Sequence, residues 1–77
     1  MNKINLFDRI VLIEDLSDAS FKAGDVGTVV EIYNDGAAYE VEFFALDGST
    51  LAVKTVSGNL VKPVSGNMVL HTREMVG

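Results

Sequence analysis

Apolar and polar residues alternate along most of this chain with the period of two that is typical of β-strands. Clusters of glycine, aspartate, asparagine and serine, which are typical turn residues, separate the apolar runs. The pattern predicts five strands, near residues 8–14, 26–33, 38–45, 50–56 and 59–64. We therefore expect residues 1–64 to form one all-β domain, a small and strongly bent β-barrel.

The clearest predicted element is a hairpin centred on Asp35-Gly36, because an Asp-Gly pair accepts the left-handed backbone conformations of tight hairpin turns. The expected cross-strand pairs are Ile32 with Tyr39, Val30 with Val41 and Glu31 with Glu40. The residues expected to point inward together are Val30, Ile32, Tyr39, Val41 and Phe43. Before this hairpin, the segment of residues 15–24 carries Leu16 and Phe21, so we expect it to fold back over the core.

The opposite face of the same two strands is expected to carry Val29, Glu31, Tyr33, Glu40 and Glu42. Two like charges directly opposite each other destabilise a sheet, so stability alone does not favour a Glu31–Glu40 pair. The pair is either tolerated in solvent or serves to bind a cationic partner.

The second hairpin has two possible registers. A two-residue turn at Asp47-Gly48 places Phe43 opposite Ala52 and misaligns the apolar faces. A loop of three or five residues around Asp47-Gly48-Ser49 instead pairs Phe43 with Val53 and Glu42 with Lys54. The second register satisfies both the core and the charges, so we expect it.

Residues 65–77 form a C-terminal extension in which Val64-Ser65-Gly66-Asn67 repeats the earlier Val56-Ser57-Gly58-Asn59. The extension is interpreted as an extra strand, a short helix or a flexible tail. The sequence leaves these three alternatives open.

The composition narrows the possible partners. The 77 residues have a formal net charge of −5, and the six Lys and Arg residues are spread singly along the chain. A nucleic-acid-binding module normally has a basic patch, so we expect no nucleic-acid partner. An acidic surface suits a basic protein partner better, although it also serves to keep a small protein in solution.

The chain shows no signal peptide, and its longest apolar run, Ile10 to Ile13, is too short to cross a membrane. We therefore expect a cytoplasmic protein without a membrane partner. The absence of cysteine leaves no disulfide and no Cys/His zinc site.

No group of residues points to catalysis. The only histidine, His71, lies in the C-terminal segment, and a serine nucleophile would need a base and an orienting group beside it. Glu14, Asp15 and Asp18 lack the ligand spacing of a calcium loop. We expect a protein that is not an enzyme, with no catalytic residue, no metal site and no cofactor.

Two apolar pairs, Val29-Val30 and Phe43-Phe44, place apolar groups on both faces of their strands, whereas a solvated antiparallel sheet normally alternates. A β-bulge or a contact with another chain would each explain them. The candidate partner-binding residues are Val29, Glu31, Tyr33, Glu40, Glu42 and Phe44.

From residue 7 to about 64 the chain resembles a family of small bacterial proteins described as a domain of unknown function. The resemblance rests on Asp8-Arg9-Ile10-Val11-Leu12, Lys22-Ala23-Gly24-Asp25-Val26-Gly27-Thr28-Val29-Val30, Tyr39-Glu40-Val41-Glu42-Phe43 and Val61-Lys62-Pro63-Val64. The Gly-Asp-Val-Gly-Thr-Val element also occurs in SH3-like barrels, which share no single function. We accordingly expect a five-stranded SH3-like barrel.

The resemblance suggests a short partner encoded beside a larger gene, with an antitoxin, immunity or accessory role. The main functional hypothesis is a non-catalytic protein-binding module that binds a co-encoded basic protein. The alternatives are an accessory subunit or homo-oligomeric structural domain that associates with itself, and a barrel that binds nucleic acid weakly.

Overall fold

The computed structural model of this chain describes residues 3–64, so the predicted extension of residues 65–77, with His71, lies outside the described residues. The elements are β1 (Arg9–Leu12), β2 (Val26–Tyr33), η1 (Asn34–Gly36), β3 (Ala38–Phe44), β4 (Thr50–Ser57), η2 (Gly58–Leu60) and β5 (Val61–Pro63). Each predicted strand is present, but the first and last are shorter than expected. Asn59 and Leu60 belong to the 3-10 turn η2 and not to the last strand.

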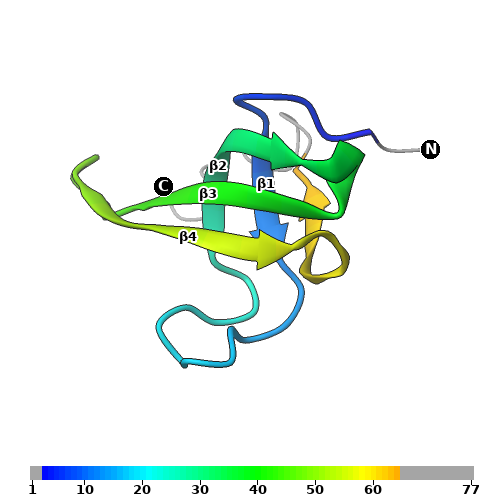
Figure 1. Ribbon diagram of the computed structural model, residues 1–77. Helices are drawn as coiled ribbons and strands as arrows, with labels where there is room; N and C mark the ends of the chain where they lie inside the picture. The colour runs from blue at the N-terminus through cyan, green and yellow to red at the C-terminus, as the bar shows by residue number, and fades with distance from the viewer. Residues whose placement is uncertain (1–2, 65–77) are drawn as a thin grey trace.

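The strands form one antiparallel sheet in the order β4-β3-β2-β1-β5. Figure 1 shows how strongly the sheet bends: β2 runs beside β1 in its first half and turns to follow β3 in its second half. The prediction of an all-β fold with five strands is confirmed. The sheet is not closed, because β4 and β5 are its two edges in the described part of the chain.

The bend of β2 coincides with a β-bulge at Val30, where the register between β2 and β3 shifts. The expected pairs of Ile32 with Tyr39 and of Glu31 with Glu40 are confirmed. The expected pair of Val30 with Val41 is wrong, because the extra residue brings Val29 opposite Val41. A bulge inserts one residue into a strand and increases its bend, which is how one strand serves both halves of this sheet.

The register of the second hairpin also differs from the expected one. Ala45 N donates to Ser49 O (2.8 Å), which closes a three-residue loop, but a second shift follows and Phe43 lies opposite Ala52. The expected pairs of Phe43 with Val53 and of Glu42 with Lys54 are therefore wrong. Because of this shift, residues 52–57 of β4 face the side of the sheet opposite to the expected one. Val56 is consequently the fully buried residue of β4.

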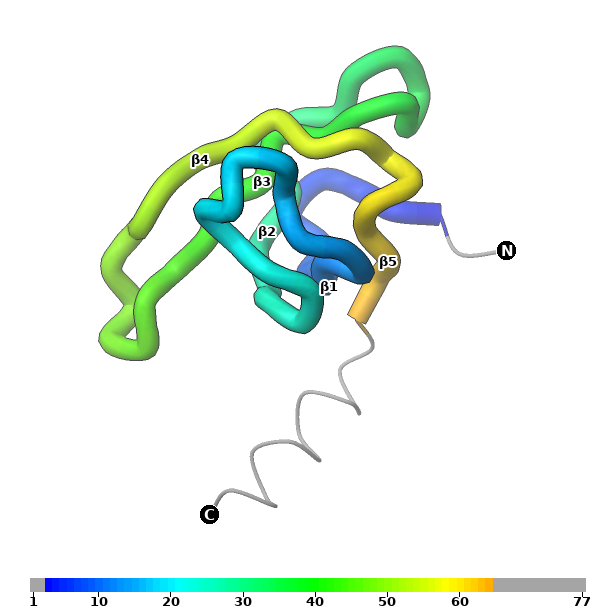
Figure 2. The backbone as a smooth tube through the Cα atoms, turned by 90° about the horizontal axis from the view of Figure 1, so that it is seen from below, coloured from blue at the N-terminus to red at the C-terminus, as the bar shows by residue number. Residues whose placement is uncertain are grey.

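The core lies on the inner, concave side of the sheet. Its buried residues are Ile4, Ile10, Leu12, Val29, Tyr39, Val41, Phe43, Val56 and Val61. The loop between β1 and β2 closes over this core, as expected, since Leu16 and Phe21 pack against it. The Phe21 ring stacks on that of Phe43 with a centroid distance of 4.1 Å. Figure 2 shows this blue-to-cyan loop in front of the sheet.

Candidate protein-binding surface

The convex side of β2, β3 and β4 faces away from the core, and we call it the outer face. It carries the side chains that alternate with the buried ones. Its residues are Glu31, Tyr33, Glu40, Glu42, Phe44, Val53 and Thr55. The structure therefore brings five of the six candidate binding residues onto one surface.

The sixth candidate, Val29, does not belong to this surface. Its side chain is fully buried, with 0% exposure, opposite Val41 in the core. The bulge at Val30 is the reason, because the extra residue turns Val29 inward and moves Val30 out of the core. The expected position of Val29 on the outer face is therefore wrong.

Glu40 lies at the centre of the outer face, between Glu31 on β2 and Thr55 on β4. Its Oε1 accepts hydrogen bonds from the Thr55 hydroxyl (2.7 Å) and from the Tyr33 hydroxyl (3.1 Å). Within residues 3–64, the structure shows no hydrogen bond to the Glu31 carboxylate that faces it. These contacts fix the position of the Glu40 charge, and Glu31 adds a second negative charge directly beside it.

The Tyr33 hydroxyl responds to this negative environment. Its hydrogen bond to Glu40 raises the pKa of Tyr33 above the usual value of 10.0, and the charges of Glu40 and Glu31 add to the effect. The phenol therefore stays protonated and continues to donate its hydrogen bond at any physiological pH.

Glu42 extends the acidic row along β3, opposite Thr28 on one side and Val53 on the other. Its Oε2 accepts a hydrogen bond from the Thr50 hydroxyl at 2.6 Å. The single ion pair between described residues joins Lys54 to Asp18 on a different side of the sheet. The three glutamates of the outer face thus have no lysine or arginine bonded to them within the described chain.

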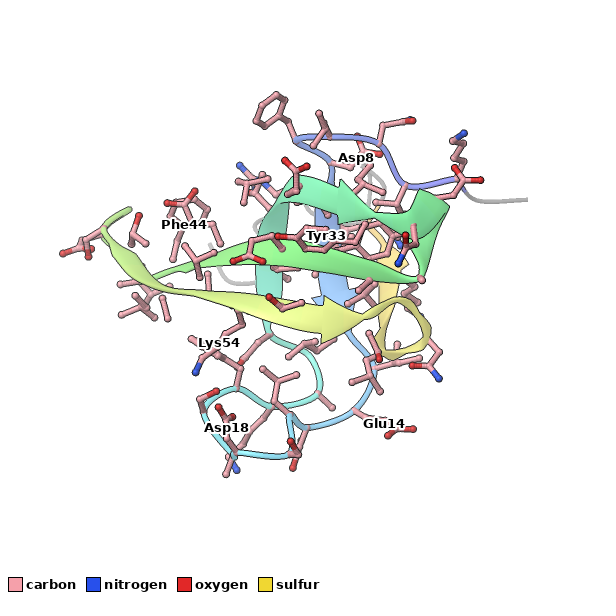
Figure 3. All side chains as sticks on the ribbon, in the orientation of Figure 1. Asp8, Glu14, Asp18, Tyr33, Phe44 and Lys54 are labelled. Atoms are coloured by element: carbon pink, nitrogen blue, oxygen red, sulfur yellow. The ribbon has the colours of Figure 1, made fainter. Side chains whose placement is uncertain are left out.

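Phe44 lies at the end of this row, where the β3–β4 hairpin projects from the rest of the molecule (Figures 1 and 3). Its side chain is 39% exposed and has further exposed apolar neighbours. Val26, Phe44 and Leu51 surround a hollow of about 120 Å³ that is also lined by Phe21, Phe43 and Asp25. Leu46, at the hairpin tip, is fully exposed.

Leu46 and Leu51 were not among the sequence candidates. A leucine placed directly before Asp47-Gly48, inside a turn that normally holds polar residues, is a signal that could have identified Leu46. Leu51 lies at the register shift between Ala52 and Thr50, so alternation along the strand does not place it.

The outer face therefore combines an exposed carboxylate, that of Glu31, and two half-buried, hydrogen-bonded carboxylates, those of Glu40 and Glu42, with an apolar end. Such a surface suits cationic side chains that carry apolar neighbours. Within residues 3–64, no group of three or more acidic or histidine side chains is placed to hold a metal ion.

One protein-family model, described as a domain of unknown function (DUF4926), matches residues 6–63. This match covers most of the chain. The protein belongs to the DUF4926 family. Searches of the curated proteins and of the solved structures returned no match.

The DUF4926 match confirms the resemblance inferred from the sequence motifs. It begins before β1 and ends at the last residue of β5, so it includes all five strands and the complete outer face. In the described part of this DUF4926 protein, no helix is long and apolar enough to pass through a membrane.

Proposed function

We propose that this protein is a non-catalytic binding module that uses its outer face to bind a basic protein partner. The observation that carries the proposal is the direct opposition of Glu31 and Glu40 at the centre of an exposed face. A like-charge cross-strand pair costs stability, and a lysine or arginine placed between the two carboxylates would reverse the sign of that interaction.

The arrangement supplies both parts of a binding interface. The Tyr33 ring and Phe44 provide apolar contact on either side of the acidic row, while Glu31, Glu40 and Glu42 provide acceptors for cationic groups. The net charge of −5 would also accelerate the encounter with a positively charged protein. We further propose a co-encoded partner in the bacterial cytoplasm, in an antitoxin-like or immunity-like relationship, as the sequence resemblance suggests.

We also propose that the bent sheet is an SH3-like, partly open barrel. The support is local: Ile13 N donates to Leu60 O at 2.9 Å, so the chain beyond β1 contacts η2 across the bend. The backbone of Val64 also bonds to Arg9 O at 3.0 Å and extends the pairing between β5 and β1.

The test begins with co-purification of the tagged full chain from its native host and identification of the retained protein. The dissociation constant of that purified partner is then measured for the wild type and for Glu31→Lys. This substitution converts the like-charge pair into a favourable Lys–Glu pair, so the variant should be at least as stable as the wild type. Binding should nevertheless weaken by about tenfold or more, because one anionic contact becomes repulsive.

Asp35→Asn is the control, since it also removes a negative charge at an exposed residue outside the outer face, and asparagine tolerates the left-handed backbone conformation of Asp35. It should leave the affinity of this partner within about twofold of the wild-type value, the change expected from net charge alone. Equal affinities for the wild type and Glu31→Lys would remove the role of the outer face.

Self-association is a second candidate function, favoured by the exposed Leu46 and by the exposed Leu51 near the projecting hairpin. Sedimentation equilibrium over a micromolar concentration range distinguishes the two. A dimer that Leu46→Ser dissociates would support self-association, whereas a monomer at all concentrations would contradict it.

A further inference from the structure

The strand β4 has one edge without a backbone partner. Within residues 3–64 it pairs with β3 alone. In an antiparallel ladder, the backbone groups of every second residue point away from the neighbouring strand. Gly58 N donates to Ala37 O (2.8 Å), and this bond shows which residues of β4 are hydrogen-bonded to β3. The backbone N–H and C=O groups of Val53 and Thr55 lie between those residues and point away from β3.

This edge carries few of the features that normally prevent strand addition. Proteins protect free edges with short strands, proline, exposed charges or a covering segment. β4 is eight residues long and contains no proline. The side chains of β4 that lie on the outer face, those of Val53, Thr55 and Ser57, are uncharged, and so is the exposed Leu51. Its one charged residue, Lys54, faces the inner side.

A groove runs along the inner side of this edge. It has a volume of about 390 Å³ and lies between residues 14–18 of the β1–β2 loop and residues 54–57 of β4. Figure 3 shows Lys54 on β4 extending toward Asp18 on the loop, while Glu14 lies toward the other end of the same loop. The volume falls within the range of known binding clefts, so a few residues of an extended peptide fit.

The walls of the groove carry a net negative charge. Its charged lining residues are three carboxylates, Glu14, Asp15 and Asp18, and one ammonium group, that of Lys54. Lys54 Nζ is held by Asp18 at 3.1 Å, and Asp15 accepts a hydrogen bond from Ala23 N. The Glu14 side chain is exposed and has no hydrogen bond within the described residues. A cationic side chain in the groove would therefore meet uncompensated negative charge.

We propose that an extended, lysine- or arginine-bearing segment of a partner protein pairs with the free edge of β4 and occupies this groove. The backbone of the segment bonds to Val53 and Thr55, and its cationic side chains face Glu14 and Asp15. A second copy of this chain is disfavoured as the occupant, because it brings a net charge of −5 to an acidic groove. The groove does not include the three glutamates of the outer face, although Val53 and Thr55 border both surfaces, so this proposal can fail while the proposed function of that face holds.

The test uses the full chain, labelled with ¹⁵N, and two synthetic peptides, a heptapeptide of alternating lysine and valine and its glutamate counterpart. The lysine peptide should shift the amide resonances of residues 14–18 and 51–57. It should also slow hydrogen exchange at Val53 and Thr55, whose amides point away from β3. The lysine peptide should bind about tenfold or more tightly than the glutamate peptide, because only the former complements the groove.

Two variants localise the effect. Val53→Pro removes an outward-facing donor from an edge strand, where proline is tolerated, and should abolish binding of the lysine peptide. Glu14→Lys keeps the backbone intact and should weaken binding of the lysine peptide severalfold. Glu31→Lys on the outer face should leave the affinity for this peptide unchanged.

Any one of the following results would overturn the proposal. One is no binding of the lysine peptide at concentrations on the order of 1 mM. Another is equal binding of both peptides, or shifts confined to the outer face. The last is a homodimer that Val53→Pro dissociates, since the occupant would then be a second copy.

Discussion

Glu31 on β2 and Glu40 on β3 lie directly opposite each other on the outer face of the sheet. Glu40 is bonded to Tyr33 and Thr55, so its carboxylate is held in place, while Glu31 has no such bond within the described chain. Glu40 therefore cannot turn away from Glu31 without breaking these two hydrogen bonds. The pair is a local cost in stability located on the surface that we propose for binding.

Replacing Glu31 by glutamine should stabilise the fold, because it removes the like-charge pair and keeps the size of the side chain. The expected gain in the free energy of unfolding is about 0.2–1 kcal/mol, measured by urea denaturation at low ionic strength. The gain should shrink in high salt, where surface charges are screened. A loss of stability at low salt would show that the Glu31 carboxylate makes a favourable contact in the folded state.

The bulge at Val30 can be tested by comparing two adjacent truncations. Val29→Ala should lower the free energy of unfolding by about 2 kcal/mol, because it removes apolar groups from a filled core. Val30→Ala is the matched control and should cost clearly less, since its side chain is only partly buried. The opposite order of the two costs would indicate the regular register in which Val30 faces Val41.

Gly27 allows β2 and β3 to approach closely. A Cβ at this position would lie 2.5 Å from Val41 Cγ1 and 2.9 Å from Glu42 O. Gly27→Ala should therefore destabilise the protein by about 1–3 kcal/mol, as overpacking does in filled cores. Thermal unfolding followed by circular dichroism measures the effect, and an unchanged midpoint would contradict this packing.

Acid should weaken the two loops that are closed by aspartate. Hydrogen bonds from the Ser20 hydroxyl and amide, followed by Lys54, hold the pKa of Asp18 well below its usual value of 3.8. The corresponding bonds from Ser49 lower the pKa of Asp47. Because these pKa values are lower in the folded state, the contribution to stability is present above pH 3.8 and is lost as the pH falls below it.

Carboxyl ¹³C resonances followed from pH 5 to pH 2 measure both titrations. Ser20→Ala should raise the pKa of Asp18 toward 3.8 and leave that of Asp47 unchanged. Ser49→Ala should do the reverse. Titration of Asp18 near its usual value in the wild type would contradict the bonding described for this loop.

The strands and the first hairpin could be predicted because their signals are local. Asp35-Gly36 fixes the turn, and alternation near the turn then places Ile32, Tyr39 and the opposed glutamates. The bulge at Val30 has no comparable local signal. Val29 and Val30 are chemically identical, and which of them is buried depends on the bend that brings β2 from β1 to β3.

The second register was mispredicted for a similar reason. A pair of Glu42 with Lys54 is favourable when only the two strands are considered. In the folded chain Lys54 bonds instead to Asp18, which lies on the β1–β2 loop and is distant in the sequence. The predicted positions of Glu31, Glu40 and Glu42 do not depend on this register, because these residues lie on β2 and β3. The position of Leu51 beside Phe44 could not be predicted, since it depends on the register shift between β3 and β4.

The most direct test of binding through the outer face is the dissociation constant of the identified partner, measured by calorimetry at low and high salt for the wild type and Glu31→Lys. We expect the wild-type complex to weaken by about tenfold or more as salt rises from about 0.05 to 0.5 M, because exposed charges are then screened. The Glu31→Lys complex should be weak at both salt concentrations, although this variant is at least as stable as the wild type. A wild-type affinity that is independent of salt and unaffected by Glu31→Lys would contradict binding through the outer face.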